Sequence, residues 1–230
     1  MLLKPLLLLA VYTFIFTVVF RARWPQIVGD DTMAYALVIF SGLITFSIFS
    51  DTVSAAPNLI LSHRNLVKRS SFPLEILPIV TLAGALFQAA LSFVVLILAL
   101  LLTGHALSLG IFLIALVWLS TGLFSLGIAY LLSAGGVFLR DLDQVVGLVV
   151  TALFFGSAIF YPLSQLPEKG RQFLAWNPTA IFVEDTRRVV FYGETVVRAE
   201  SGVLVGLSLA VFWFGYTRFM RSKGAFADVF

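Results

Sequence analysis

The chain has 230 residues, of which 60% are hydrophobic and only 12% are charged. A water-soluble domain carries roughly 25% charged residues, so this composition excludes a soluble protein and indicates an integral membrane protein. The sequence contains no cysteine, which excludes disulfides and thiolate sites, and its formal charge of +3 is too small to indicate nucleic-acid binding.

Six largely apolar runs follow one another along the chain, and each ends at proline, glycine or charged residues. A membrane-spanning helix needs about 20 apolar residues. We therefore expect an all-α integral membrane protein with six transmembrane helices in a single domain over residues 1–230. The expected spans are residues 5–20, 34–56, 74–102, 109–134, 145–161 and 202–219.

The distribution of basic residues sets the orientation, because Lys and Arg prefer the cytoplasmic side. With the N-terminus inside, the inner segments hold eight of the fifteen Lys and Arg residues. Five of the other seven lie in the long segment 162–201, among acidic residues. We therefore expect both termini in the cytoplasm. The first run ends at Arg21 without a small-residue cleavage site, so we expect a span there and not a cleaved signal peptide.

The first inner loop, residues 58–73, combines apolar and basic residues. Leu59, Ile60, Leu66 and Val67 recur at nearly helical spacing, which predicts a short amphipathic helix on the cytoplasmic face. Such a helix either lies on anionic lipid or docks a soluble partner.

The second inner loop places Arg140 beside Asp141 and Asp143. Opposite charges on a tight turn are usually a solvated cap, but they could also contact the same partner.

The outer segment between the fifth and sixth runs predicts two short amphipathic helices. Asn177 before Pro178 is a favourable N-cap and first-turn combination, so the second helix is expected to begin there and the first to end before it. Glu184 and Arg188 lie four residues apart and can pair on this helix. The two helices either close the edge of the bundle or form a gate.

Aromatic residues make up 14% of the chain, including 23 phenylalanines. In the chosen orientation they gather in the outer halves of the first and fifth runs. They form either an interfacial belt or a pathway whose ring faces stack on sugars. Small residues at Gly202, Gly206 and Ala210 predict a close helix contact, within one subunit or between two.

Several chemistries have no counterpart in the sequence. Asp51 is the ionisable residue that lies well inside a run, so an ion-coupled relay is disfavoured. The sequence has no G-x-x-x-x-G-K-[ST] phosphate loop and no G-x-S-x-G or H-E-x-x-H motif, so we expect neither ATP hydrolysis nor another enzymatic activity on this chain. His63 and His105 are far apart in the sequence, and we expect no metal site.

A series of short motifs then points to a family. They are Asn58-Leu59-Ile60, Leu66-Val67, Phe72-Pro73, Glu75, Leu77-Pro78, Phe138-Leu139-Arg140-Asp141, Tyr161-Pro162, Leu166-Pro167, Trp176-Asn177-Pro178 and Arg187. Together they cover essentially the whole chain. In this order the chain resembles the permease subunit of bacterial ABC exporters for polysaccharides and polyol phosphates, which move lipid-linked O-antigen, capsule or teichoic acid.

The resemblance implies a homodimer in the bacterial cytoplasmic membrane, joined by two copies of a separate ATP-binding subunit that carries Mg-ATP. No cofactor is then expected on this chain. Relatives carry a basic amphipathic helix before the first span, and this sequence departs from that pattern. The alternatives are an ABC permease for a small lipid or drug and a membrane scaffold that transports nothing.

The resemblance also implies roles for particular residues. By this resemblance, the residues expected to dock the ATP-binding subunit are His63, Arg64, Lys68, Arg69, Arg140, Asp141 and Asp143. The residues expected to line the channel are Tyr12, Phe14, Phe16, Phe20, Phe154, Phe155, Phe160 and Tyr161. The residues expected to form the outer gate are Trp176, Asn177, Pro178, Glu184, Arg187 and Arg188.

Overall fold

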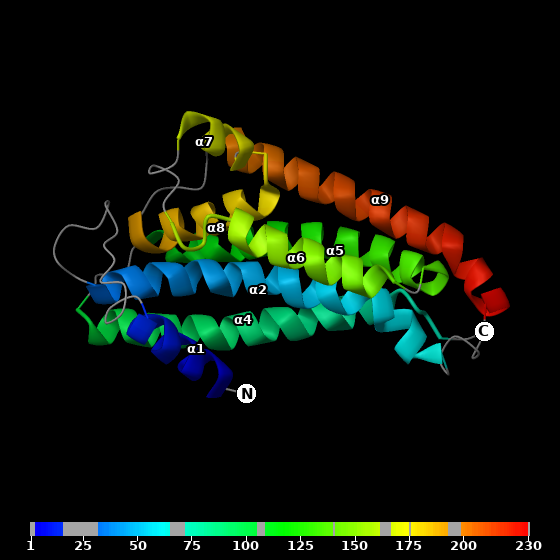
Figure 1. The fold of residues 1–230 in the computed structure, drawn as a ribbon, viewed down its shortest axis with the longest axis horizontal. Coiled ribbons are helices and arrows are strands. Elements are labelled where there is room, and N and C mark those ends of the chain that lie inside the picture. Colours follow the sequence, from blue (N-terminus) through cyan, green and yellow to red (C-terminus); the bar gives the residue numbers. More distant parts are fainter. Residues whose placement is uncertain are drawn as a thin grey trace. The chain divides into compact units, whose positions relative to one another are not determined.

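The computed structural model describes residues 3–15, 32–64, 72–104, 109–139, 141–161, 167–174, 176–192 and 199–229. Within these ranges every regular element is a helix (Figure 1). The α-helices are α1 (Leu3–Thr13), α2 (Thr32–Ser62), α4 (Ile76–Leu102), α5 (Ile114–Phe138), α6 (Leu142–Gly156), α7 (Glu168–Leu174), α8 (Pro178–Arg187) and α9 (Ala199–Val229). The 3-10 helix η2 (Leu109–Leu113) precedes α5, and the π-helix η4 (Arg188–Tyr192) follows α8.

Four helices are long and apolar enough to cross a membrane: Met33–Ser62, Ile76–Leu102, Gly110–Phe138 and Gly202–Phe226. A helix rises 1.5 Å per residue, so each exceeds the roughly 30 Å of a bilayer's hydrocarbon core. They overlap the predicted runs 34–56, 74–102, 109–134 and 202–219. The chain is therefore a multi-pass membrane protein.

The other two predicted runs are helical only in part. The described part of the run 5–20 is α1, with residues 14–15 in a π turn, and the remainder lies outside the described residues. The prediction of a helix through residue 161 is wrong, because α6 ends at Gly156. Ser157 and Thr179 share a hydroxyl hydrogen bond, and Ala158 adopts a left-handed backbone (φ 51°) that a helix cannot accommodate.

Residues 58–73 were predicted to form a separate amphipathic helix, but the first of them belong to α2. Residues 58–62 continue α2, which contains Pro57 in its interior. We expected the second span to end before this proline, but in a packed membrane helix neighbouring groups can satisfy the carbonyl that proline leaves without a donor. His63 and Arg64 follow directly, whereas residues 65–71 lie outside the described part of the chain.

The chain forms two compact units, each built from three stretches of sequence. Unit 1 comprises Met1–Phe46, Phe87–Val117 and Phe154–Ser201. Unit 2 comprises Ser47–Leu86, Trp118–Leu153 and Gly202–Phe230.

Unit 2 depends on two very close helix contacts. A Cβ added to Gly215 of α9 would lie 2.0 Å from the carbonyl oxygen of Gly127 in α5. A Cβ added to Gly136 of α5 would lie 2.0 Å from the carbonyl oxygen of Pro57 in α2. Glycine is required at both positions because the backbones of the paired helices touch.

Tyr130 forms the centre of the aromatic core of unit 2 and is 1% exposed. Its ring packs against Phe212, Tyr216 and Phe219 of α9, with centroid distances of 5.2 to 6.2 Å. Its hydroxyl donates to the carbonyl oxygen of Glu75 at 2.9 Å. The Tyr130 side chain therefore connects α5, α9 and the residue that precedes α4.

The same residue, Glu75, also forms an ion pair. Lys223 Nζ donates to Glu75 Oε2 at 2.7 Å, and this hydrogen bond holds the pKa of the Glu75 carboxyl below its usual range. Both side chains are partly exposed, so the pair contributes less than about 1 kcal/mol to stability.

Glu75→Gln is expected to lower the melting temperature in detergent by at most about 4 °C at neutral pH. The folded-state pKa is lowered, so the stabilisation is present above the unfolded pKa and is lost as pH falls through the folded value. The difference between wild type and variant should therefore shrink below about pH 4. Glu168→Gln, which changes an exposed carboxyl, is the control. A difference that persists unchanged at low pH would contradict this assignment.

Candidate functional site: helix α8 and the ring cluster

Helix α8 begins where the sequence predicts. Asn177 is the N-cap, its Oδ1 accepts from the Thr179 backbone N–H at 3.0 Å, and Pro178 occupies the first turn. The preceding short helix, α7, ends at Leu174. Two short helices are therefore present before α9, with the boundary at Asn177 as expected.

Asn177 also connects α8 to the end of α6. Its Nδ2 donates to the carbonyl oxygen of Gly156 at 2.9 Å, while its Oδ1 accepts from the Thr179 hydroxyl at 2.7 Å. Because the Thr179 hydrogen is used in that bond, the Ser157 hydroxyl donates to Thr179 Oγ1. Asn177 therefore hydrogen-bonds both to the C-terminal end of α6 and to the first turn of α8.

Three of the predicted lining residues form one ring cluster, defined as Phe154, Phe155 and Phe160. Their centroids lie 5.2 to 6.3 Å apart, in tilted and edge-to-face arrangements. Such geometries are favourable for aromatic pairs. Phe155 remains 61% exposed, so the cluster presents a ring to its surroundings.

Other aromatic residues border the ring cluster. Tyr12 of α1 lies 6.4 Å from Phe160, and Phe46 of α2 lies 5.5 Å from Phe154, between centroids. The Tyr161 hydroxyl donates to the carbonyl oxygen of Phe155 at 3.0 Å. Phe14 is 60% exposed, and Phe16 and Phe20 lie outside the described residues. Sequence reasoning missed Phe46, which lies in another run and carries no local signal.

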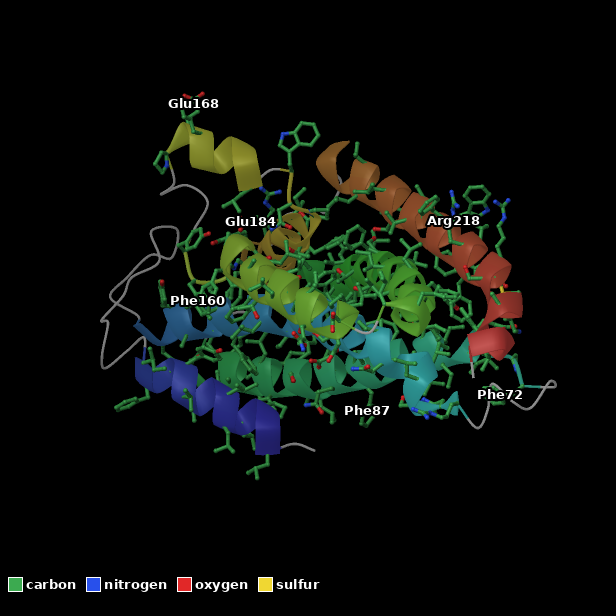
Figure 2. The ribbon with its side chains drawn as sticks, turned by 45° about the vertical axis from the view of Figure 1, so that its right-hand side comes forward. Phe72, Phe87, Phe160, Glu168, Glu184 and Arg218 are labelled. Atoms are coloured by element: carbon green, nitrogen blue, oxygen red, sulfur yellow. The ribbon has the colours of Figure 1, made fainter. Side chains whose placement is uncertain are left out.

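Arg187 is the most deeply buried charged side chain among the described residues, with 0% exposure. Its Nη1 donates to the carbonyl oxygen of Ala158 at 2.8 Å, and its Nη2 donates to that of Ile159. Glu184 lies 3.5 Å from Arg187 Nη1 and 3.9 Å from Arg188 Nε. Figure 2 labels Phe160 and Glu184, which mark the two elements that this contact joins.

Burial lowers the pKa of the Arg187 guanidinium, and the Glu184 carboxylate opposes that shift. Arginine stays charged in proteins, so α8 holds a buried cation with a partly buried carboxylate beside it. Arg188 is more exposed and also lies 3.5 Å from Asp185 Oδ1. The predicted pairing of Glu184 with Arg188 is present, but the closer partner of Glu184 is Arg187.

The remaining predicted gate residue, Trp176, is 88% exposed. It directly precedes Asn177, the N-cap of α8. An exposed indole is typical of a residue at a membrane–water interface or a partner surface.

The predicted docking residues are described in part. His63 is half-buried and its Nδ1 lies 2.8 Å from the carbonyl oxygen of Leu59, while Arg64, Asp141 and Asp143 are exposed. The other predicted docking residues, Lys68, Arg69 and Arg140, lie outside the described residues. Within the described ranges, no group of three His, Asp or Glu side chains is placed to hold a metal ion.

Comparison with known proteins identifies the family. The model of the family described as "ABC-2 type transporter" matches residues 1–191. The chain belongs to the ABC-2 type transporter family. This ABC-2 chain is 27% identical over 229 residues to the O-antigen export system permease protein RfbA of Myxococcus xanthus, covering 98% of the chain and 85% of that relative.

Two further relatives agree with that assignment. The O-antigen export system permease protein RfbA of Klebsiella pneumoniae is 24% identical over 229 residues, covering 98% of the ABC-2 chain and 84% of the relative. The polysialic acid transport protein KpsM of Escherichia coli is 24% identical over 195 residues, covering 84% and 75%. The family resemblance expected from the motifs is therefore confirmed.

Several residues of the site were not predicted. Tyr35 donates to the carbonyl oxygen of Phe160 at 2.8 Å, and Thr45 contacts the hydroxyl of Thr186 at 2.7 Å. Tyr35 and Thr45 lie in the predicted run 34–56, where no short motif marks them. A signal was present, because Thr45 and Thr186 are hydroxyl residues among apolar neighbours and a buried hydroxyl needs a partner.

Proposed function

We propose that the chain is the membrane-spanning permease subunit of an ABC exporter that moves lipid-linked polysaccharide of the O-antigen, capsule or teichoic acid type. The observation that carries the proposal is the match to the ABC-2 family over residues 1–191, together with relatives named for O-antigen export and polysialic acid transport. The multi-pass helices and the exposed ring of Phe155 support it.

The energy for transport then comes from a separate ATP-binding subunit. The sequence contains no phosphate loop of its own, so Mg-ATP binds the partner and this chain carries no cofactor. We propose a homodimer with two copies of that subunit. In this assembly Arg64, Asp141 and Asp143, together with the docking residues outside the described ranges, face the partner.

The proposed topology has six spans in the bacterial cytoplasmic membrane, with both termini in the cytoplasm. The four long helices are four of these spans, and the segments that contain α1 and α6 are the other two. Helices α7 and α8 then lie on the outer side as gate helices. This placement puts the ring cluster in the outer half of the membrane domain.

A polysaccharide pathway gives the ring cluster a physical role. Aromatic faces pack on the C–H faces of sugar rings without a specific set of hydrogen bonds. Many such weak contacts let a polymer advance, whereas one tight site would retain it. The ring cluster and Tyr12 supply several such faces close together.

Replacing Phe155 and Phe160 by leucine is expected to lower polysaccharide export by about fivefold or more, since each of the two aromatic contacts contributes about 0.5–1.5 kcal/mol. ATP hydrolysis by the assembled complex should remain. Export is measured as polysaccharide at the cell surface per amount of complex. The matched control is Phe112→Leu, because Phe112 is 81% exposed and belongs to η2. Export at the wild-type rate in the double variant would remove the ring cluster from the pathway.

A further inference from the structure

The segment that follows α6 is non-helical but buried. Ser157 and Ile159 are 0% exposed and Ala158 is 1% exposed. Ala158 has a φ of 51°, which a residue with a side chain rarely adopts. Irregular backbone in a membrane protein is tolerated where other groups satisfy its polar atoms. The side chains that donate hydrogen bonds to this segment therefore hold its backbone in place.

Side chains supply donors to three carbonyls of the segment and to the last carbonyl of α6. Gly156 O accepts from Asn177, Ala158 O and Ile159 O accept from Arg187, and Phe160 O accepts from Tyr35. Three of these four carbonyls bond to α8 or its N-cap, and Ser157 also bonds to Thr179 of α8. Helix α8 is thus the main support of the segment.

The Arg187 guanidinium occupies a space beside Gly42 of α2. Gly42 of α2 leaves the space, because a Cβ there would lie 3.0 Å from Val183 Cγ1 and 3.3 Å from Arg187 Nη2. One residue before Arg187, the Thr186 hydroxyl contacts Thr45 of α2. The planar guanidinium reaches two successive carbonyls with two different nitrogens, which a lysine ammonium cannot reproduce.

The segment also carries the ring cluster. Phe154 and Phe155 belong to the last turn of α6, and Phe160 lies one residue beyond the carbonyl that Arg187 Nη2 binds. Ala158 has a left-handed backbone, and beyond it the Phe160 ring packs on Phe154 with centroids 5.2 Å apart. Loss of the Arg187 contacts would release the part of the backbone that brings these rings together.

We propose that Arg187 is a positioning residue for transport, which locks α8 to segment 157–161 so that α8 and the ring cluster move as one body. This inference rests on the proposed function, because it assigns the ring cluster to the polysaccharide pathway. It changes the expected role of Arg187 in the gate. The residue does not contact the polymer but couples any movement of α8 to the rings.

A movement of α8 alone would leave the Ala158 and Ile159 carbonyls without their donor, and it would leave the Arg187 guanidinium without these two acceptors. Such groups are costly to leave unpaired when buried. A joint movement keeps all of these bonds. The gate therefore opens together with the ring cluster and not by separation from it.

The first test compares Arg187→Gln with Arg221→Gln in the complex with the ATP-binding subunit. Each variant removes one positive charge, but the Arg187 side chain is 1% exposed whereas Arg221 is exposed on α9. For Arg187→Gln we expect export to fall by about tenfold or more while ATP hydrolysis per complex stays within about twofold. Arg221→Gln should export normally. Normal export by Arg187→Gln would overturn the proposal.

Arg187→Lys separates positioning from simple charge balance with Glu184. Lysine keeps the charge beside Glu184 but donates from a single nitrogen, so it cannot reproduce the contact that Nη1 and Nη2 make with two successive carbonyls. We therefore expect normal accumulation with export still reduced. Full export by Arg187→Lys would show that only the charge matters and would overturn the proposal.

A cross-link tests the joint movement even if Arg187→Gln fails to accumulate. The chain contains no cysteine, so Ser157→Cys combined with Thr179→Cys gives a unique pair whose side-chain oxygens are 2.5 Å apart in the wild type. Export is expected to be the same in the oxidised and reduced states. Loss of export on oxidation, restored by reduction, would show that α8 must leave the segment and would overturn the proposal.

Different results would exclude the proposed function and the positioning role of Arg187. If the wild-type complex exports no lipid-linked polysaccharide, the proposed function fails before any variant is compared. If Phe155→Leu with Phe160→Leu exports normally while Arg187→Gln does not, the sugar pathway is wrong and the lock between α8 and the segment stands.

Discussion

Replacing Gly215 by alanine is expected to prevent the chain from accumulating as a folded membrane protein. The added Cβ would lie 2.0 Å from the carbonyl oxygen of Gly127, and the obstacle is helix backbone, which cannot rotate away as a side chain can. Overpacking between side chains costs about 1–3 kcal/mol, and a backbone clash at a helix crossing should exceed that. The measurement is the yield of monodisperse protein after detergent extraction.

The matched control for that substitution is Gly206→Ala on the same helix. No atom lies within 4 Å of the Cβ position there in the described structure. Alanine is a better helix former than glycine by about 1 kcal/mol, so this variant should accumulate normally or melt slightly higher. Equal yields of the Gly215→Ala and Gly206→Ala variants would contradict the close contact between α5 and α9.

Reversing the charges of Arg64, Lys68 and Arg69 together is expected to abolish stable binding of the ATP-binding subunit. These residues belong to the predicted docking segment, and three reversals replace attraction by repulsion across one surface. A loss of about 1.4 kcal/mol already lowers affinity tenfold, so the amount of co-purified subunit should fall by at least about tenfold.

The control for the charge reversal is Arg218→Glu with Arg221→Glu. Both side chains are exposed on α9 (Arg218 is labelled in Figure 2), and the predicted topology places them on the same side of the membrane. This control should retain the subunit. Unchanged co-purification of the triple variant would exclude the docking role of the segment.

The long spans were predictable because the signal for a membrane helix is additive along the chain. Hydropathy summed over about 20 residues locates α2, α4, α5 and α9 without knowledge of their neighbours. The N-cap at Asn177 was predictable for a related reason, since a cap is made by residues that are adjacent in sequence.

The end of α6 was not predictable, because its cause is distant in sequence. Residues 157–161 are apolar enough to continue a span, and what stabilises their irregular backbone is Arg187 and Asn177 of another helix and Tyr35 of a third. In the sequence Arg187 is simply a basic residue in an outer segment. Its burial follows from the space that Gly42 leaves.

The close contacts at glycines also depend on residues that are distant in sequence, so the sequence did not predict which glycines make them. The spacing of Gly202, Gly206 and Ala210 predicted a close helix contact, but the Cβ positions at Gly202 and Gly206 meet no atom within 4 Å in the described structure. The contact within the subunit is instead made by Gly215 against Gly127. A small-residue pattern shows that a helix can approach closely, and the position of the partner helix decides which glycine is used.

Transport by this ABC-2 chain as the membrane part of an ATP-driven polysaccharide exporter requires a complex with an ATP-binding subunit. We would co-express the chain with an ATP-binding subunit of a polysaccharide ABC exporter, purify through this chain, and measure the subunit ratio and ATP hydrolysis. We expect a stable complex with two copies of each subunit that hydrolyses ATP and restores surface polysaccharide in cells. A chain that retains no ATP-binding subunit and leaves surface polysaccharide unchanged would contradict it.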